Sequence, residues 1–181
     1  MFERAKELAG RLFGQDVERR QAHELYVSIA EAARRTGFYA DLSAPDTTEG
    51  RYDILSLHMI LVLRRLKAER DSTAKYAQLL FDIMFRDVDD SLREMGVGDL
   101  RVGKKVREYA EAFFGRALAY EEALDGESDL NEALARNVYG DLETPHAPGL
   151  ASYVRRADDA LKAQDIAAIM AGKISFPDVT E

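Results

Sequence analysis

Cysteine is absent from the 181 residues of this chain. Its absence excludes disulfide bonds, catalysis by a cysteine thiolate and zinc sites built on sulfur ligands. A hydrophobic run long enough to cross a membrane is also missing, because a membrane-spanning helix needs about 20 apolar residues. The longest apolar run, residues 54–63, is interrupted by Ser56 and His58. It therefore predicts a helix that is buried in a protein core.

The chain has fewer basic than acidic residues, with 25 Lys and Arg residues against 33 Asp and Glu residues. Its net charge is therefore −8. Such a surface disfavours non-specific binding to nucleic acid, so DNA is not expected as a partner. The first residues, 1–13, also lack the features of a targeting peptide. They include Glu3 and Glu7 and no long apolar region, which argues against a secretory signal and a mitochondrial transit peptide.

What the sequence does contain is a helical pattern of apolar residues. Hydrophobic residues make up 46% of the chain and charged residues 32%, a balance that is typical of a globular protein. The length suits one domain, residues 1–181, with a single core. No segment alternates apolar and polar residues for long enough to form a strand. The expected fold is therefore all-α, a single-domain helical bundle of about six to eight helices.

The boundaries of the expected helices follow from apolar spacing and from turn residues. Helices are expected over residues 2–13, 16–36, 51–67, 71–95, 102–124 and 129–137, with a later helix that carries Leu150 and Leu161 and an extended tail over 172–181. Asp16 is expected to cap the second helix, and Asp71 or Ser72 the fourth. Gly37 and Gly96 are expected to end helices. The helix over 51–67 is apolar on nearly every side, which predicts a central position.

The core is expected to include five large side chains from three helices: Leu57, Leu61, Phe85, Leu92 and Phe113. His58 lies within the central helix, where a lone histidine is usually a hydrogen-bonded core residue. Phe38 and Tyr39 fall in the loop that we expect over 38–50. Both are too apolar for a solvated loop, so either they pack inward or they edge a binding groove.

Residues 1–14 allow two interpretations. Phe2, Leu8 and Leu12 share one side of a helix, and charged residues occupy the rest. This helix either docks on the body of the protein or lies as a peripheral amphipathic helix on a membrane surface. The acids Glu3 and Glu7 weaken the second interpretation.

Residues 81–105 combine a packing face, an acidic face and a basic end. Six apolar side chains recur at steps of three and four residues, as on one stripe of a helix: Phe81, Met84, Phe85, Val88, Leu92 and Met95. The acids of this segment are Asp82, Asp87, Asp89, Asp90 and Glu94, and a cationic run follows at Arg101, Lys104, Lys105 and Arg107. The connection over 96–101 is short, so the two helices that it joins are expected to be antiparallel neighbours.

The acids raise the alternative of a small helical, metal-dependent enzyme that uses residues 82–94. A helical enzyme that binds diphosphate through magnesium needs carboxylates one turn apart on two facing helices. A second acidic cluster, which the facing helix would have to supply, is missing from the sequence. Asp82 with Arg86, and Asp89 with Arg93, have instead the i,i+4 spacing of ordinary ion pairs.

Residues 98–104 match the GxxxxGK skeleton of a phosphate-binding loop. The context is wrong for that function, because a helix rather than a strand is expected before the motif. Lys105 also stands where a Ser or Thr should bind magnesium. No catalytic residue, metal ligand or cofactor is therefore expected.

Several segments of the chain resemble a known family. They read RYDILSLHMILVLRRL, LFDIMFRDVDDSLREMGVGDLRVGKKV, AFFGRALAYEEAL and LNEALARNVY, and the preceding FYADLSAPDTTEGR is similar to the FY…PDT…GR loop of the same family. The similarity covers about residues 20–165. The family is that of the ubiquinol–cytochrome c chaperones.

The resemblance implies a non-enzymatic assembly factor for the respiratory ubiquinol–cytochrome c reductase (bc) complex. Family members bind newly made cytochrome b and work with a small partner protein, so these are the partners that the resemblance implies here. The chain lacks the long N-terminal extension of the mitochondrial members, which points to a bacterial protein. A cytoplasmic location with peripheral contact at the inner membrane is implied as well.

Binding of such a client is expected on the polar side of the helix over 71–95 and the turn after it. A chaperone for a membrane protein should carry charges complementary to the client's loops. It should also have an apolar groove that binds the client's helices. The expected charged partner-binding residues are Asp82, Arg86, Asp89, Asp90, Arg93, Glu94, Asp99, Arg101, Lys104 and Lys105. Aromatic anchors usually carry the affinity, and the candidates, provided that they are exposed, are Phe38, Tyr39 and Phe114.

Overall fold

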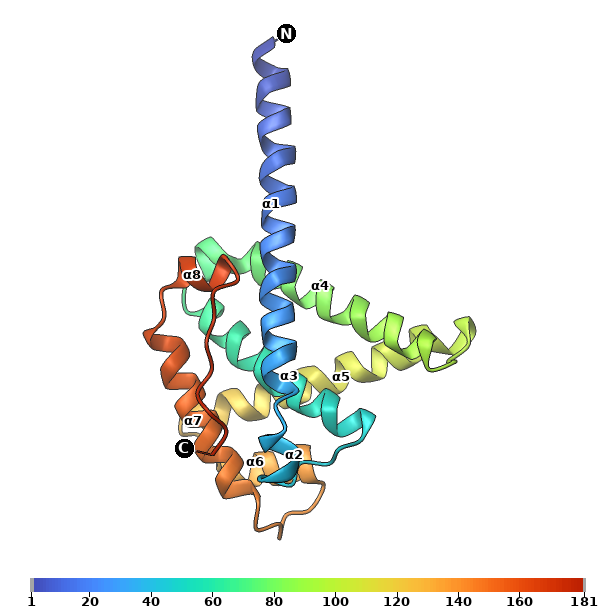
Figure 1. Ribbon diagram of the computed structural model, residues 1–181, viewed down its shortest axis with the longest axis vertical. Helices are drawn as coiled ribbons and strands as arrows, with labels where there is room; N and C mark the ends of the chain where they lie inside the picture. Colours follow the sequence, from blue (N-terminus) through green and yellow to red (C-terminus); the bar gives the residue numbers. More distant parts are fainter. Residues whose placement is uncertain (1, 181) are drawn as a thin grey trace.

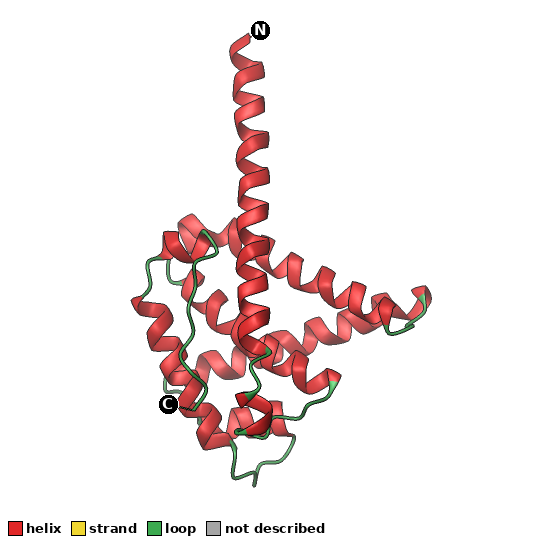
Figure 2. Ribbon diagram, viewed as in Figure 1, coloured by secondary structure: helices red, strands yellow, loops and turns green. Residues whose placement is uncertain are grey.

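The computed structural model describes the backbone of residues 2–180 and the side chains of residues 16–180. The long helices are α1 (Phe2–Ala33), α3 (Thr48–Lys67), α4 (Arg70–Glu94), α5 (Asp99–Leu124) and α7 (Ala147–Ala163). The short ones are α2 (Gly37–Ala40), α6 (Leu130–Leu134), the π-helical turn η1 (Ala135–Tyr139) and α8 (Ile166–Met170). Figure 2 shows helices joined by loops and no strand over these residues, so the all-α prediction is confirmed.

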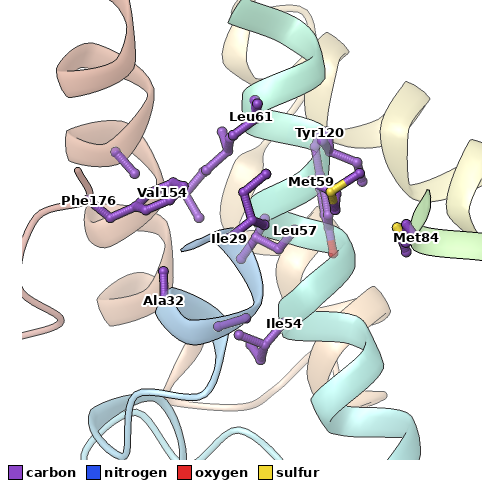
Figure 3. Close-up of a cluster of buried hydrophobic side chains, with 14 of the residues drawn as sticks. Ile29, Ala32, Ile54, Leu57, Met59, Leu61, Met84, Tyr120, Val154 and Phe176 are labelled. Atoms are coloured by element: carbon purple, nitrogen blue, oxygen red, sulfur yellow. The ribbon is translucent and has the colours of Figure 1, made fainter. Parts of the chain in front are cut away.

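Helix α3 lies at the centre of the bundle, as its apolar sequence predicts. It contacts α1, α4, α5, α7 and η1, and its side chains are buried along nearly its whole length. Figure 3 shows Ile54, Leu57, Met59 and Leu61 of α3 among side chains from the surrounding elements, namely Ile29, Ala32, Met84, Tyr120, Val154 and Phe176. A residue such as Leu61 therefore meets neighbours that are distant in sequence.

Helix α3 begins three residues earlier than predicted. The side chain of Thr47 accepts a hydrogen bond from the Gly50 amide at 3.1 Å, which caps the helix. Gly50 is required at this turn, since a Cβ atom there would lie 2.0 Å from the carbonyl oxygen of Pro45. The chain between Ala40 and Thr48 folds back closely on the start of α3.

The predicted break between residues 13 and 16 does not exist, because α1 is one continuous helix. Asp16, predicted as a cap, lies inside it. The segment contains no proline, and a glycine such as Gly14 destabilises a helix by only about 1 kcal/mol. In Figure 1 the N-terminal half of α1 extends away from the other helices. The side chains of residues 1–15, on which the membrane interpretation depends, lie outside the described part, so that interpretation stays a prediction.

Gly37 does not form the predicted left-handed cap, but is the first residue of α2. Its lack of a side chain has another reason: a Cβ atom at Gly37 would lie 2.9 Å from the Cβ atom of Val179 in the C-terminal tail. The neighbouring Phe38 is fully buried, with its ring centroid 4.8 Å from that of Tyr153 and 5.2 Å from that of His58. Part of the loop expected over 38–50 is thus a short helix that belongs to the core.

Helices α4 and α5 are antiparallel neighbours, as predicted. The hairpin that they form projects from the body of the protein (Figure 1). Helix α4 is followed by Gly96 with φ of 83°, a left-handed conformation that favours glycine. The predicted cap of α4 by Asp71 or Ser72 is wrong, because the helix starts at Arg70 without a side-chain cap. The hydroxyl of Ser72 donates instead to the Glu69 carbonyl at 3.1 Å.

The apolar stripe of α4 is buried only in part. Met84, Val88 and Leu92 are buried, whereas Phe81 and Phe85 are half-buried. Met95 is 53% exposed because it follows the last residue of α4, at the tip of the projecting hairpin. The prediction of an inward Met95 is therefore wrong, whereas Phe85 packs against the core with only part of its side chain exposed. Those for Leu57, Leu61, Leu92 and Phe113 are confirmed, with each at most 5% exposed.

The C-terminal elements close the other side of α3. Asp129 caps α6 by accepting a hydrogen bond from the Asn131 amide at 2.8 Å. The tail after α8 is extended and is held along its length. Arg35 donates to the Pro177 carbonyl at 2.8 Å, and Arg156 donates to the Asp178 carbonyl at 3.0 Å.

Candidate functional site

A groove of about 230 Å³ lies where α1, α2, α3, α4 and α5 meet. We call it the tyrosine groove. Its large apolar and aromatic lining residues are Tyr39, Tyr52, Leu55, Val88, Leu92, Met95 and Tyr109, and its charged ones are Arg34, Arg51 and Asp87. The lining thus joins the C-terminal half of α4 to the first turns of α3, and the groove continues to the hairpin tip through Met95.

Two of the three tyrosines of this groove, Tyr39 and Tyr52, are fixed by hydrogen bonds to backbone carbonyls. Tyr52 donates to the Tyr109 carbonyl at 2.8 Å, and the centroids of the two rings lie 4.5 Å apart at an interplanar angle of 76°. Tyr39 donates to the Ala33 carbonyl at 2.9 Å. Burial raises the pKa of Tyr52 to about 12, so its hydroxyl keeps its proton at neutral pH. Because these two hydroxyls are engaged, the rings of Tyr39 and Tyr52 offer mainly apolar surface to a ligand.

Charges of opposite sign stand on the two sides of the tyrosine groove. On the α3 side, Arg51 bonds to Asp46 at 2.6 Å, and its guanidinium carbon lies 5.7 Å from the Tyr39 ring centroid. On the α4 side, Asp87 accepts a hydrogen bond of 2.6 Å from the hydroxyl of Tyr26. Burial and the neighbouring Asp87 raise the pKa of Tyr26 well above its usual range, which keeps it a donor.

The structure brings most of the predicted charged residues together at the hairpin tip. Asp89, Asp90, Arg93 and Glu94 lie in the last turns of α4, and Asp99, Arg101, Lys104 and Lys105 lie in the first turns of α5. Met95 and the fully exposed Leu100 add apolar surface there. Asp82 and Arg86 lie further back along α4 and border this group rather than belong to it.

Of the two predicted i,i+4 ion pairs of α4, one is present in the structure. Arg93 bonds to Asp89 at 2.6 Å, which confirms the i,i+4 pair, and it also reaches Asp99 across the turn. Asp82 does not pair with Arg86 among the described contacts, but accepts a hydrogen bond from Gln78 at 2.8 Å. The turn between α4 and α5 therefore neutralises part of its own charge.

The aromatic candidates separate into three environments. Phe38 is fully buried and cannot anchor a partner, so its place among the candidate binding residues is corrected. Tyr39 is half-buried and lines the tyrosine groove. Phe114 is 59% exposed but stands 15 residues after Asp99 on α5, about 22 Å along the helix from the hairpin tip.

Sequence reasoning missed the tyrosine groove itself. Tyr52 lies near the start of the central helix and Tyr109 lies on α5, and neither was among the predicted binding residues. Asp87 had been grouped with the other acids, although its position between Met84 and Val88 puts it at the edge of the buried stripe. That edge position was the signal in the sequence that Asp87 differs from the exposed acids. Its hydrogen bond with Tyr26, which is 61 residues away, could not be predicted from the sequence.

Nothing in the described part of the chain favours the metal-dependent alternative. Among those residues, no group of three or more His, Cys, Asp or Glu side chains could hold a metal ion. The GxxxxGK motif contributes no loop, because Gly98 precedes α5 and Gly103 lies inside it. The described helices also include none that is long and apolar enough to span a bilayer.

Comparisons with known proteins point in one direction. A family model described as ubiquinol-cytochrome C chaperone matches residues 40–176. The chain is 27% identical over 166 residues to human ubiquinol-cytochrome c reductase complex assembly factor 1, covering 88% of this chain and 55% of that protein. The mouse protein of the same name is 27% identical, with 88% and 56% covered. This chain thus spans about half the length of the curated relatives that it matches.

A solved structure agrees over nearly the whole chain. The crystal structure of the Cbp3 homolog from Brucella abortus has a TM-score of 0.84 and 41% sequence identity, covering 95% of this chain and 97% of the other. The match of the family model extends over most of the helices described above, from the end of α2 to the C-terminal tail. The chain therefore belongs to the ubiquinol-cytochrome C chaperone family.

Proposed function

We propose that this protein is a non-enzymatic chaperone that binds cytochrome b and promotes its incorporation into the ubiquinol–cytochrome c reductase complex. Membership of the family and the names of the curated relatives support a role in the assembly of that complex. The choice of a membrane protein as client is supported by one observation. An aromatic groove opens beside a hairpin tip that carries charges of both signs.

The size of the tyrosine groove favours side chains of a protein over a small-molecule substrate. Its volume of about 230 Å³ lies below the roughly 300–1,000 Å³ of typical small-molecule pockets. One or two large apolar side chains of a client helix would fill it. Tyr39, Tyr52 and Tyr109 would supply the rigid aromatic contacts that usually dominate the affinity of an interface.

The hairpin tip would meet the charged loops that flank the client's helices. Asp90 and Glu94 form no ion pair among the described residues, so their charges remain open to a partner. Complementary charge at the edge of an interface mainly raises the association rate and the specificity, and it is weakened by salt. A small second subunit could share this work, as the family resemblance implies.

Reversing two acids of the hairpin tip should test the proposed client surface. We expect the Asp89→Lys, Asp90→Lys double variant to keep its helical circular dichroism and to bind cytochrome b roughly tenfold more weakly, with a shallower salt dependence. The assay is capture of cytochrome b made by cell-free translation in detergent, with an unrelated polytopic membrane protein as the specificity control.

A matched variant carries the same change of net charge around the C-terminal end of α5, far from the hairpin tip. Glu122→Lys with Glu127→Lys replaces two exposed acids, and capture should remain as in the wild type. Equal capture by both double variants would remove the hairpin tip from the client surface. Unfolding of the Asp89, Asp90 variant would instead show that these acids stabilise the fold, with Asp89 acting through its ion pair with Arg93.

The N-terminal half of α1 is proposed to contact the membrane surface. It extends beyond the body of the protein in Figure 1, so removing residues 1–14 should leave the core intact. We expect the full chain to sediment with vesicles that contain anionic lipid, and the shortened chain to stay mostly in the supernatant with unchanged circular dichroism. Vesicles of zwitterionic lipid are the control, and equal sedimentation of the two proteins would exclude this contact.

A further inference from the structure

A second hollow, of about 230 Å³, borders the tyrosine groove, because Tyr52 and Tyr109 line both. We call it the charged hollow. The rest of its lining comes from α3 and α5 and is mostly charged: Glu49, Asp53, Lys105, Glu108, Ala112 and Arg116. A change of charge in this hollow can therefore act on two aromatic residues of the tyrosine groove.

One ion pair of the charged hollow is largely buried. The carboxylate of Asp53, on α3, bonds to the guanidinium of Arg116, on α5, at 2.6 Å, and the two side chains are 12% and 17% exposed. Solvent and salt screen such a pair only weakly, so the loss of one charge strongly affects the other. Burial raises the pKa of Asp53 to about 6, although the neighbouring Arg116 opposes the shift. The pair is therefore complete at pH 7 and loses its negative charge as the pH falls to 5.

The other titratable groups around Asp53 come from the same two helices. They are Glu49 and Tyr52 on α3, and Lys105, Glu108, Tyr109 and Tyr120 on α5. Lys105 lies 3.8 Å from Glu108, so these two charges offset each other. Burial raises the pKa of each of the three tyrosines, which stay neutral. Among the described side chains Arg116 forms an ion pair with Asp53 alone, so protonation of Asp53 leaves this cation without its partner.

The position of this pair along α5 gives it mechanical importance. Four polar links join α3 to α5 and its C-cap: Arg64 with Asp125, Lys67 with Glu121, Asp53 with Arg116, and the Tyr52 hydroxyl with the Tyr109 carbonyl. The first two lie at the C-terminal ends of both helices. Between Asp99 and Glu108, α5 has no hydrogen bond or ion pair to α3 among the described contacts. The Asp53 pair and the Tyr52 bond are therefore the last polar links before the hairpin projects from the body.

We propose that the Asp53–Arg116 pair holds α5 in the position that shapes the tyrosine groove, and that loss of the pair in acid releases the hairpin and weakens client binding. A charge-assisted hydrogen bond is about twice as strong as a neutral one, so a protonated Asp53 holds Arg116 less firmly. Neither residue lines the tyrosine groove. Both are positioning residues that act through Tyr109 and the hairpin tip. The inference rests on the proposed function, since cytochrome b is the client in question.

Spin labels measure the position of the hairpin without a client. The chain has no cysteine, so Leu100→Cys at the hairpin tip and Leu142→Cys between η1 and α7, both at exposed leucines, give two defined labelling sites. We expect the distance distribution from double electron–electron resonance to differ between pH 7 and pH 5. With Asp53→Asn, the pH 5 distribution should be seen at both pH values, because asparagine resembles the protonated acid. The same distribution at both pH values without Asp53→Asn would overturn the proposal.

Capture of cytochrome b, made by cell-free translation in detergent, connects the hairpin to the client. A carboxyl group with a pKa of about 6 is roughly nine-tenths ionised at pH 7 and one-tenth ionised at pH 5. If only the ionised form binds well, the apparent affinity of the wild type should fall roughly tenfold between these pH values. Asp53→Asn should bind roughly tenfold more weakly than the wild type at pH 7 and lose nothing more at pH 5.

Glu49→Gln is the matched control, since it removes an acid of the same hollow, one turn before Asp53, and leaves the pair intact. It should capture cytochrome b as the wild type does at pH 7. Its loss at pH 5 should be smaller, because Glu49 contributes to the raised pKa of Asp53. Circular dichroism at both pH values checks that each protein is folded.

Two results of the capture assay have different meanings. A loss of affinity in acid that persists in Asp53→Asn would overturn the inference, because other groups would then be responsible. A wild type that captures no cytochrome b at pH 7 would contradict the proposed function. The distance measurement would still decide whether the Asp53–Arg116 pair positions α5, because it needs no client.

Discussion

Replacing Leu61 with alanine is expected to lower the free energy of unfolding by about 2–5 kcal/mol. Leu61 is 1% exposed and lies on α3, which contacts helices on several sides. Figure 3 shows it within the cluster of side chains that joins α3 to its neighbours. A cavity at this position is surrounded by elements that are themselves held in place, so the structure cannot collapse to fill it.

Urea unfolding followed by circular dichroism measures this change, provided that the slope of the transition stays the same. Leu100→Ala is the matched control, because Leu100 is 101% exposed and the same atoms are removed. Its effect should stay within about 0.5 kcal/mol. A loss below about 1 kcal/mol for Leu61→Ala would mean that α3 is not the packing centre of the fold.

Acid should destabilise the protein through His58, which is the second large effect that we expect. The ring is fully buried and hydrogen-bonded at both nitrogens. Nδ1 lies 2.8 Å from the Ile54 carbonyl, which can only accept, so Nδ1 carries the proton and Nε2 accepts from the Tyr153 hydroxyl at 2.8 Å. The rings of Phe38 and Phe176 lie 5.2 and 5.0 Å from the imidazole. This surrounding favours the neutral form.

Burial lowers the pKa of His58 from 6.5 to about 4. Between these two values the unfolded chain binds a proton that the folded chain does not, so stability is lost as the pH falls. The His58 contribution is fully present above pH 6.5 and declines as the pH falls toward 4. Between pH 7 and pH 5 this group alone should lower the free energy of unfolding by about 2 kcal/mol.

The measurement compares urea unfolding of the wild type and of His58→Gln at pH 7 and pH 5. Glutamine can also donate to the Ile54 carbonyl and accept from Tyr153, but it does not titrate. Both proteins keep all other titratable groups, so the difference between their losses of stability removes the contributions of those groups. One of them is Asp53, whose carboxylate bonds to Arg116 at 2.6 Å. Burial raises the pKa of Asp53 to about 6, so its effect has the opposite sign and favours the folded state as the pH falls.

A second variant separates titration from hydrogen bonding. Tyr153→Phe removes the hydroxyl that Nε2 accepts from, and it should lower stability by a similar amount at both pH values. Equal losses between pH 7 and pH 5 in the wild type and in His58→Gln would show that His58 does not titrate with a lowered pKa.

Local patterns were enough to determine the class of fold and the central helix. Spacings of three and four residues describe contacts within one helix, so the sequence predicted α3, α4 and α7 without knowledge of their partners. The same reasoning placed His58 in the core and ended α4 at Gly96, since a left-handed glycine is a local feature. The Asp89 and Arg93 pair is another contact within a single turn.

Tertiary structure alone decided which side chains are covered and which remain open. Tyr39, Tyr52 and Tyr109 belong to three helices, and only packing brings them into one groove. Phe38 is buried because Tyr153 meets it. Met95 has the same apolar spacing as the rest of the α4 stripe, but it is exposed because the hairpin extends beyond the other helices. A helical period determines which residues share a face, whereas the arrangement of the other helices determines whether that face is covered.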